Sequence, residues 1–168
     1  MPPISPPPTT DGGAADALAT CPTQVRCTCF MVRSLSRKIS QLYDDALAPS
    51  GLKGTQFSLL LQARTRRGQA PLTVSALAGA LHTDRTTLTR NLRTLEQAGL
   101  IALQAGADAR SRCVVVTPAG EQSFRQAVAL WKQAQAQIRA LCGAEQIAAL
   151  EQLVDGLLPR MAHVQEAA

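Results

Sequence analysis

The chain has 168 residues, which is enough for one domain with a substantial hydrophobic core. Its hydrophobic content of 46% comes mostly from Ala and Leu, and only five residues are aromatic, so the composition favours helices over sheet. The net charge is +5, and residues 26–117 hold thirteen Lys and Arg against five Asp and Glu. The basic charge therefore lies in a segment where a polyanion could dock.

The sequence lacks the features of several other protein classes. No run of 18 or more apolar residues is present, so we expect no membrane span, and the N-terminus has no secretory signal pattern. Two histidines, no paired carboxylates in an apolar setting, no Gly-rich phosphate loop and no Ser/His/Asp spacing argue against an enzyme, and no cofactor is expected. Five cysteines, an odd number, indicate reduced thiols in a cytoplasmic protein.

The N-terminal part predicts a tail followed by a helix. Residues 1–20 are rich in Pro, Gly, Ala and Thr and predict a disordered tail. Residues 21–47 are amphipathic, with apolar residues every three or four positions, and predict a helix. The APSG sequence at residues 48–51 ends this helix, since Pro and Gly are helix breakers.

A second helix of about four turns is predicted over residues 53–67. It ends in a basic cluster formed by Arg64, Arg66 and Arg67. Such a cluster is either a solvated helix end that complements the helix dipole or a contact to phosphate. The residues alone leave both interpretations open.

Residues 72–100 predict two short helices in succession. Thr73 is a candidate N-cap for the first, and Asp84 for the second, where its carboxylate can accept from the amide of Thr86 or Thr87. In the second helix an apolar stripe recurs at i, i+4 and i+7 and Gly99 closes the helix. The residues of this stripe are Leu88, Leu92 and Leu95.

The opposite face of the second helix is basic and carries hydroxyl groups. Its members are Arg85, Thr86, Thr89, Arg90 and Arg93. Arginines can reach guanine edges and phosphates, and short hydroxyl side chains let a helix approach DNA closely. A solvated face usually mixes charge signs in i, i+4 pairs, and residues 85–93 include no acid, so the pattern favours DNA reading over a merely solubilising surface.

A β-hairpin follows. Residues 100–104 and 113–117 are β-prone arms separated by a polar tip, and the hairpin must pack on the preceding helices to be stable. Asp108 and Arg110 lie near the tip, and Arg112 begins the return strand. An Arg at such a tip can enter the minor groove, while the Asp can hold the loop. Two helices and a hairpin of this kind predict a winged helix-turn-helix.

Two further helices are predicted at the C-terminal end. Thr117 and Pro118 form an N-cap and N1 pair that starts a helix to about residue 141. The last helix covers roughly residues 144–163, and Pro159 should kink or end it. Both helices carry more apolar surface than one winged unit can cover, so a second copy of the chain is the expected partner.

Across about residues 25–163 the sequence resembles the MarR family of transcriptional regulators. The resemblance rests on LYDDALAPSGL (42–52), TQFSLL (55–60), LTVSALAGALHTDRTTLTRNLRTLEQAGLI (72–101) and DARSRCVVVTPAG (108–120). It implies a mainly α fold with a small β-hairpin wing, divided into a first dimerisation helix (21–52), a winged helix-turn-helix DNA-binding domain (53–117) and C-terminal dimerisation helices (118–168). The tail (1–20) falls outside the resemblance.

The resemblance also implies a homodimeric repressor on a pseudo-palindromic DNA operator, with an effector or an oxidant that changes the spacing of its two DNA-binding units. The residues expected to contact DNA are Thr73, Arg85, Thr86, Thr87, Thr89, Arg90, Arg93, Asp108, Arg110 and Arg112.

Two effector chemistries fit the sequence. The first is a small aromatic or phenolic anion, the effector class of many relatives, bound between the dimer helices and the winged domain. The candidate residues are Arg33, Arg37, Tyr43 and His82, although each Arg could equally be a surface charge and the His a residue beside a helix cap.

The second chemistry uses thiols. Cys27 and Cys29 form a CxC pair at the start of the first helix, just after Cys21, where a helix N-terminus favours the thiolate. The combination of Cys29 and Tyr43 is similar to the peroxide-sensing branch of the family, although Arg33 stands where that branch usually has a second Tyr. Cys142 is a candidate resolving thiol or a packed small residue, and the CxC group could instead hold a soft metal ion or be incidental.

Overall fold

The computed structural model describes residues 27–65, 70–106 and 111–165 of the chain. These residues divide into a short N-terminal unit, residues 27–36, and a larger unit, residues 37–165. The predicted tail, Cys21, Arg66, Arg67, Asp108 and Arg110 lie outside the described residues.

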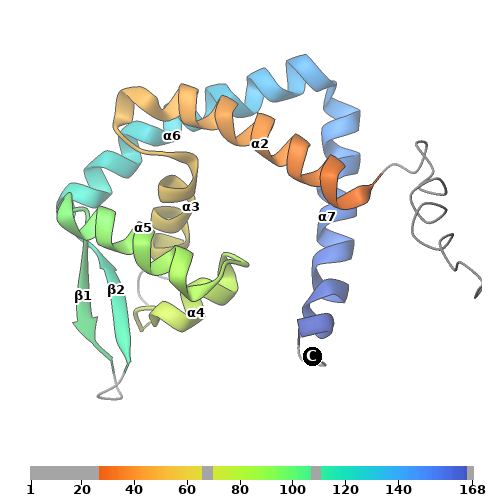
Figure 1. The fold of residues 1–168 in the computed structure, drawn as a ribbon. Coiled ribbons are helices and arrows are strands. Elements are labelled where there is room, and N and C mark those ends of the chain that lie inside the picture. Colours follow the sequence, from red (N-terminus) through yellow and green to blue (C-terminus); the bar gives the residue numbers. More distant parts are fainter. Residues whose placement is uncertain (1–26, 66–69, 107–110, 166–168) are drawn as a thin grey trace, which may run out of the picture. The chain divides into compact units, whose positions relative to one another are not determined.

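The fold is mainly helical with one small hairpin, as the sequence predicts (Figure 1). The elements are α2 (Thr28–Leu47), η1 (Ala48–Ser50), α3 (Gly54–Thr65), α4 (Val74–Ala80), α5 (Arg85–Gln97), β1 (Ile101–Ala105), β2 (Arg112–Val116), α6 (Pro118–Cys142) and α7 (Ala144–Gln165).

Local capping explains where the helices begin and end. The hydroxyl of Thr73 accepts a hydrogen bond from the amide of Ala76 (3.1 Å), and the carboxylate of Asp84 accepts from the amide of Thr87 (2.8 Å). Gly99, at φ +70°, ends the turn after α5 in the left-handed conformation. These predicted helix signals are confirmed.

The core lies where α3 contacts α4, α5, α6 and β2. The leucine stripe of α5 is buried against it, with Leu88, Leu92 and Leu95 no more than 2% exposed. On the other side of α3, the ring of Phe57 stacks on that of Phe124 with 5.0 Å between centroids. Burial of this stripe fixes the rotation of α5, so its polar face must point outward.

The hairpin is antiparallel, with Ile101 opposite Val116 and Ala105 opposite Arg112. The segment before α4 extends it, because the amide of Val114 donates to the carbonyl of Leu72 (2.9 Å). Figure 1 shows the hairpin descending from the end at which α5 stops. The hairpin is thus tied to both helices of the helix-turn-helix.

Pro159 was expected to kink or end the last helix, and the structure shows that the helix does not end there. Helix α7 continues through Pro159 to Gln165. Pro159 cannot donate to the carbonyl of Asp155, but both residues are exposed, so water can satisfy that carbonyl. An interior Pro therefore does not stop an exposed helix here.

Several large apolar side chains are exposed within this chain. On α7 they are Leu153, Val154, Leu157, Leu158 and Met161, and on the first turns of α2 they include Phe30 and Val32. No helix among the described residues is long and apolar enough to cross a membrane.

Candidate nucleic-acid interface

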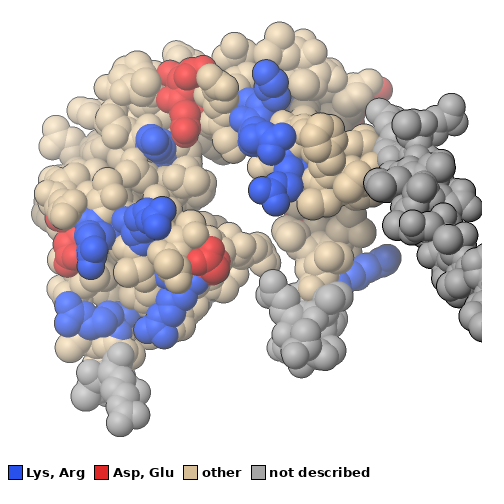
Figure 2. Space-filling model, viewed as in Figure 1, with Lys and Arg blue, Asp and Glu red and all other residues tan. Residues whose placement is uncertain are grey.

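The outward face of α5 is the predicted reading surface. Arg85, Thr86, Thr89, Arg90 and Arg93 are all exposed. The buried leucine stripe on the opposite side of the helix causes this exposure. Figure 2 shows Lys and Arg side chains gathered on the part of the molecule that holds α4, α5 and the hairpin.

Three elements bring predicted DNA-contacting residues to one hollow of about 450 Å³. Arg85, Thr89 and Arg93 come from one flank of α5, Thr73 from the start of α4, and Arg112 from the start of β2. Residues far apart in the sequence therefore face a common space beside the helix. This is the arrangement expected of a helix and wing that follow one DNA backbone.

Sequence reasoning missed an acid in this hollow. Glu96 is exposed and lines the hollow together with Arg93 and Arg112. The stretch from residue 85 to 93 has no acid, but Glu96 lies one turn further along the same flank of α5. Extending the helical spacing by one turn would have found it.

Thr87 is separated from the other predicted contacts. Its amide is used by the cap at Asp84, and the residue lines a second cavity on the other flank of α5, with Leu88 and Asn91. Hydrogen bonding by Thr87, first from its hydroxyl and then from its amide, lowers the pKa of Asp84 below its ordinary value. Asp84 is therefore ionised at neutral pH and fixes the first turn of α5.

The second cavity has a volume of about 690 Å³, which is the size of a small-molecule site. It brings together two of the four predicted effector residues, Tyr43 from α2 and His82 from the turn before α5. Phe57 and Trp131 supply aromatic walls. Arg37 is exposed and is not among the lining residues, and none of the lining residues is Lys or Arg. Arg33 is an exposed residue of the N-terminal unit.

Two polar groups of this cavity have distinctive properties. Burial raises the pKa of Tyr43, while Arg139 lowers it and Glu151 raises it. Tyr43 is therefore a neutral hydroxyl that can donate a hydrogen bond. His82 has φ +47°, the left-handed region that residues other than Gly rarely adopt.

The cysteines lie in different surroundings. Cys27 and Cys29 are exposed at the start of α2, and Cys113 is buried in β2 as expected. Cys142 is exposed, so the interpretation of Cys142 as a packed small residue is wrong for the single chain. No group of three or more His, Cys, Asp or Glu that could hold a metal is found in the part of the chain that the structure describes.

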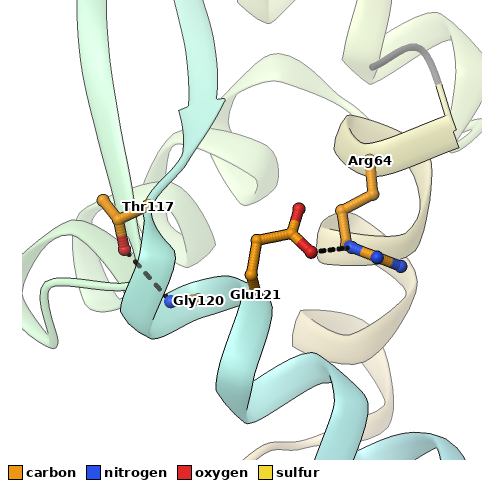
Figure 3. Close-up of polar contacts among 4 residues, drawn as sticks. All are labelled: Arg64, Thr117, Gly120 and Glu121. Atoms are coloured by element: carbon orange, nitrogen blue, oxygen red, sulfur yellow. Dashed lines mark hydrogen bonds and ion pairs between the residues drawn. The ribbon is translucent and has the colours of Figure 1, made fainter.

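Arg64 is not a solvated helix end, because its guanidinium is engaged within the protein. Its guanidinium Nε donates to Glu121 Oε2 at 2.8 Å (Figure 3). The same guanidinium lies 4.2 Å from the centre of the Phe124 ring. The interpretation of Arg64 as a solvated helix end is therefore wrong, and the interpretation as a phosphate contact stays a prediction.

The fold is that of a winged helix-turn-helix protein. Helix α5 packs its leucine stripe into the core, the capped helix α4 precedes it, and the hairpin of β1 and β2 follows it. Residues 52–111 match the family model described as "MarR family". The chain is 38% identical to the M. tuberculosis transcriptional regulator MosR, solved in complex with DNA, over 79% of this chain and 99% of that one, with a TM-score of 0.65. The chain belongs to the MarR family.

Other similar proteins have the same character. A mutant of E. coli MarR in complex with operator DNA is 25% identical over 77% of this chain and 91% of that one, with a TM-score of 0.68. An uncharacterized HTH-type transcriptional regulator of Bacillus subtilis, YwoH, is 28% identical over 56% of this chain and 67% of its own length. This chain is accordingly a DNA-binding transcriptional regulator and not an enzyme.

Proposed function

We propose that the chain is a cytoplasmic homodimeric repressor that binds a pseudo-palindromic operator and is released by a small aromatic or phenolic anion. The observation that carries the proposal is the face of α5, where three arginines and two threonines point away from the core. These side chains would read base edges and phosphates of the major groove.

The wing would extend the contact. Arg112 lies in the same hollow as Arg85 and Arg93, so the start of β2 would follow the DNA backbone beside the major groove. Asp108 and Arg110 lie outside the described residues; the family resemblance implies that they act at the wing, and we propose that Arg110 reaches the minor groove.

A second copy would bury the exposed apolar side chains of α7, such as Leu153 and Leu157. In a two-fold dimer the two α5 helices must enter major grooves about one helical turn, roughly 34 Å, apart. A small change in the angle between the two winged domains would then abolish simultaneous docking.

The effector would bind in the 690 Å³ cavity, where it would touch Leu88 and Asn91 on the inner side of α5. A ligand in this cavity would contact α5 directly, so binding of the effector could shift α5 and release the DNA. None of the described residues that line the cavity is Lys or Arg, so the ligand would hydrogen-bond to His82 and to the hydroxyl of Tyr43. This lining suits a phenol better than a carboxylate that needs a guanidinium partner.

An electrophoretic mobility assay with the DNA upstream of the protein's own gene tests the repressor proposal. We expect a retarded band that disappears in the double variant Arg85→Ala with Arg90→Ala. A thermal-shift screen with phenols and aromatic acids tests the effector, since a ligand of the native state raises the melting temperature. A retained band in the double variant would exclude α5 as the reading helix.

A second candidate is a thiol switch, favoured by the exposure of both Cys27 and Cys29. Hydrogen peroxide would be reduced to two waters, or an alkyl hydroperoxide to an alcohol and one water, while two thiols are oxidised to one disulfide, either within this pair or with Cys142 of a second copy. Loss of DNA binding on peroxide treatment that is absent in Cys29→Ser supports the switch. Stabilisation by Zn²⁺ in the same screen would instead favour a metal sensor.

A further inference from the structure

The pair formed by Arg64 and Glu121 is a buried link between two helices. Glu121 is the one charged residue among those described that is buried, at 9% exposed, and Arg64 has a side chain that is 26% exposed. Arg64 lies near the end of α3, and Glu121 lies in the first turn of α6. The link therefore joins the core helix of the winged domain to the helix that leaves it.

The guanidinium of Arg64 is held on two sides. Its Nε donates to Glu121 at 2.8 Å, and its Cζ lies over the ring of Phe124, which in turn stacks on Phe57. Stacking on an aromatic ring and an ion pair with a carboxylate together fix both the position and the orientation of an Arg side chain. Arg64 is thus engaged within the protein.

The first turn of α6 is also fixed to the end of the reading helix. The hydroxyl of Thr117 accepts from the amide of Gly120 (3.0 Å) and donates to the carbonyl of Gly99 (2.7 Å), just after α5. Gly120 is so close to the carbonyl of Leu100 that a Cβ at this position would collide with it. Figure 3 shows the hydrogen bond between Thr117 and Gly120 beside the ion pair of Glu121 with Arg64, at the start of α6.

We propose that Arg64 is a positioning residue for DNA recognition, acting through Glu121 on the junction of α5, the hairpin and α6, and not through phosphate. The inference rests on the proposed DNA-contacting surface of α5. Arg64 holds the first turn of α6 against α3, and Thr117 and Gly120 transmit that position to the end of α5 and the start of β1.

The proposal predicts that removing the negative charge of Glu121 weakens DNA binding, whereas simple electrostatics predicts that it strengthens DNA binding. Glu121→Gln removes a negative charge, and removing an acid from a DNA-binding protein should strengthen DNA binding if long-range charge alone mattered. We expect Glu121→Gln to weaken binding by about tenfold, because the junction loses the ion pair that positions it. Arg64→Gln should weaken binding by about the same factor, and the double variant should be no weaker than either single variant.

The experiment uses the full chain and a fluorescein-labelled duplex that the wild-type protein selects from a random-sequence pool. Fluorescence anisotropy gives the dissociation constant at several salt concentrations for each variant. The temperature is one at which circular dichroism shows every variant folded. Arg125→Gln, an exposed Arg of α6, is the matched charge control, and Arg85→Ala is the reference for a phosphate or base contact.

A contact and a positioning residue differ in salt dependence. The slope of log affinity against log salt concentration is negative, and each lost phosphate contact reduces its magnitude by about 0.9. Arg85→Ala removes two contacts from a dimer, so it should reduce the magnitude of the slope by about 2. We expect Arg64→Gln to keep the slope of the Arg125→Gln control while losing affinity. A slope lowered as in Arg85→Ala, or a tighter complex for Glu121→Gln, would overturn the proposal.

The charge-swapped pair, Arg64→Glu with Glu121→Arg, tests the pairing itself. Recovery of affinity relative to either single reversal supports the inference, and additive losses would overturn it. Should Arg64→Gln fail to fold, Arg64→Lys replaces it in the comparison. We then expect a DNA affinity between those of the wild type and a tenfold loss, and an unchanged salt slope. If Arg85→Ala changes neither affinity nor slope, the proposed surface of α5 fails independently of the result at Arg64.

Discussion

At the scale of single residues, His82 occupies a backbone conformation that its side chain disfavours. Its φ of +47° lies in the turn between α4 and α5, where its amide donates to the carbonyl of Gly79 (3.1 Å). A residue with a Cβ in this region costs roughly 1–2 kcal/mol, against a smaller entropic cost for Gly. His82 also lines the 690 Å³ cavity, so this strained turn lies at the proposed ligand site.

We predict that His82→Gly stabilises the protein by up to about 1 kcal/mol, because Gly adopts this turn without the Cβ penalty. Urea unfolding followed by circular dichroism measures the change. His82→Ala is the control, since it removes the imidazole and keeps the strained conformation, and it should not be stabilising. Equal stability of the Gly and Ala variants would show that the turn carries no strain.

Asp84 makes the start of α5 sensitive to acid. Hydrogen bonds from Thr87 lower the pKa of Asp84 in the folded protein. A carboxyl group whose pKa is lower when folded stabilises the protein at any pH above its unfolded pKa of about 3.9, and this contribution is lost as the pH falls through the folded pKa. We therefore predict that the melting temperature of wild type exceeds that of Asp84→Ala at neutral pH and that the difference closes below about pH 4.

Asp84→Asn separates capping from charge in the same titration. Asn accepts the same hydrogen bond but does not titrate, so its melting temperature should lack the acid-dependent loss that belongs to this residue. If wild type and Asp84→Asn follow parallel curves down to acid pH, the cap does not depend on ionisation.

At the scale of the element, one face of α5 packs into the core and the opposite face carries the residues proposed to bind DNA. The leucine stripe holds the helix in the core, and the arginines on the far side are free of that packing. We predict that Arg85→Ala with Arg90→Ala weakens DNA binding and lowers the salt slope by about 4 in a dimer, if each Arg meets one phosphate, while the free energy of unfolding changes by less than about 0.5 kcal/mol. Anisotropy titrations and urea unfolding measure the two quantities.

A variant of equal charge loss elsewhere provides the comparison. Arg125→Ala with Lys132→Ala removes two exposed cations from α6 and should affect the slope far less. Equal slopes for the two double variants would mean that overall charge, and not the face of α5, attracts the DNA.

The elements also show what sequence can and cannot predict. The caps at Thr73, Asp84 and Thr117 and the stripe of α5 were predictable, because each depends on residues within one or two turns of each other. The pair of Arg64 and Glu121 joins residues 57 positions apart and depends on how α3 and α6 pack, so no local pattern indicates it. The convergence of Arg112 with Arg93 was predictable only in outline, from the hairpin following the helix.

At the scale of the whole molecule, the exposed leucines of α7 require an explanation beyond the single chain. Leu153 is 62% and Leu157 is 53% exposed, on a helix whose other exposed apolar residues include Val154 and Met161. Each Leu moved from water into an interface contributes about 1.5–3 kcal/mol, and a two-fold interface counts every residue twice. We therefore expect this surface to be buried in the proposed association of two copies, which the proposed operator requires.

We predict that Leu157→Glu weakens the dimer by at least about 100-fold, because two carboxylates would enter the apolar contact. Sedimentation velocity over a concentration series measures the shift to monomer. Gln152→Glu, an exposed position of the same helix with the same added charge, is the control and should remain dimeric. DNA affinity should fall with the dimer, since one winged domain alone makes half of the contacts. A Leu157→Glu protein that stays dimeric would place the subunit interface away from this face of α7.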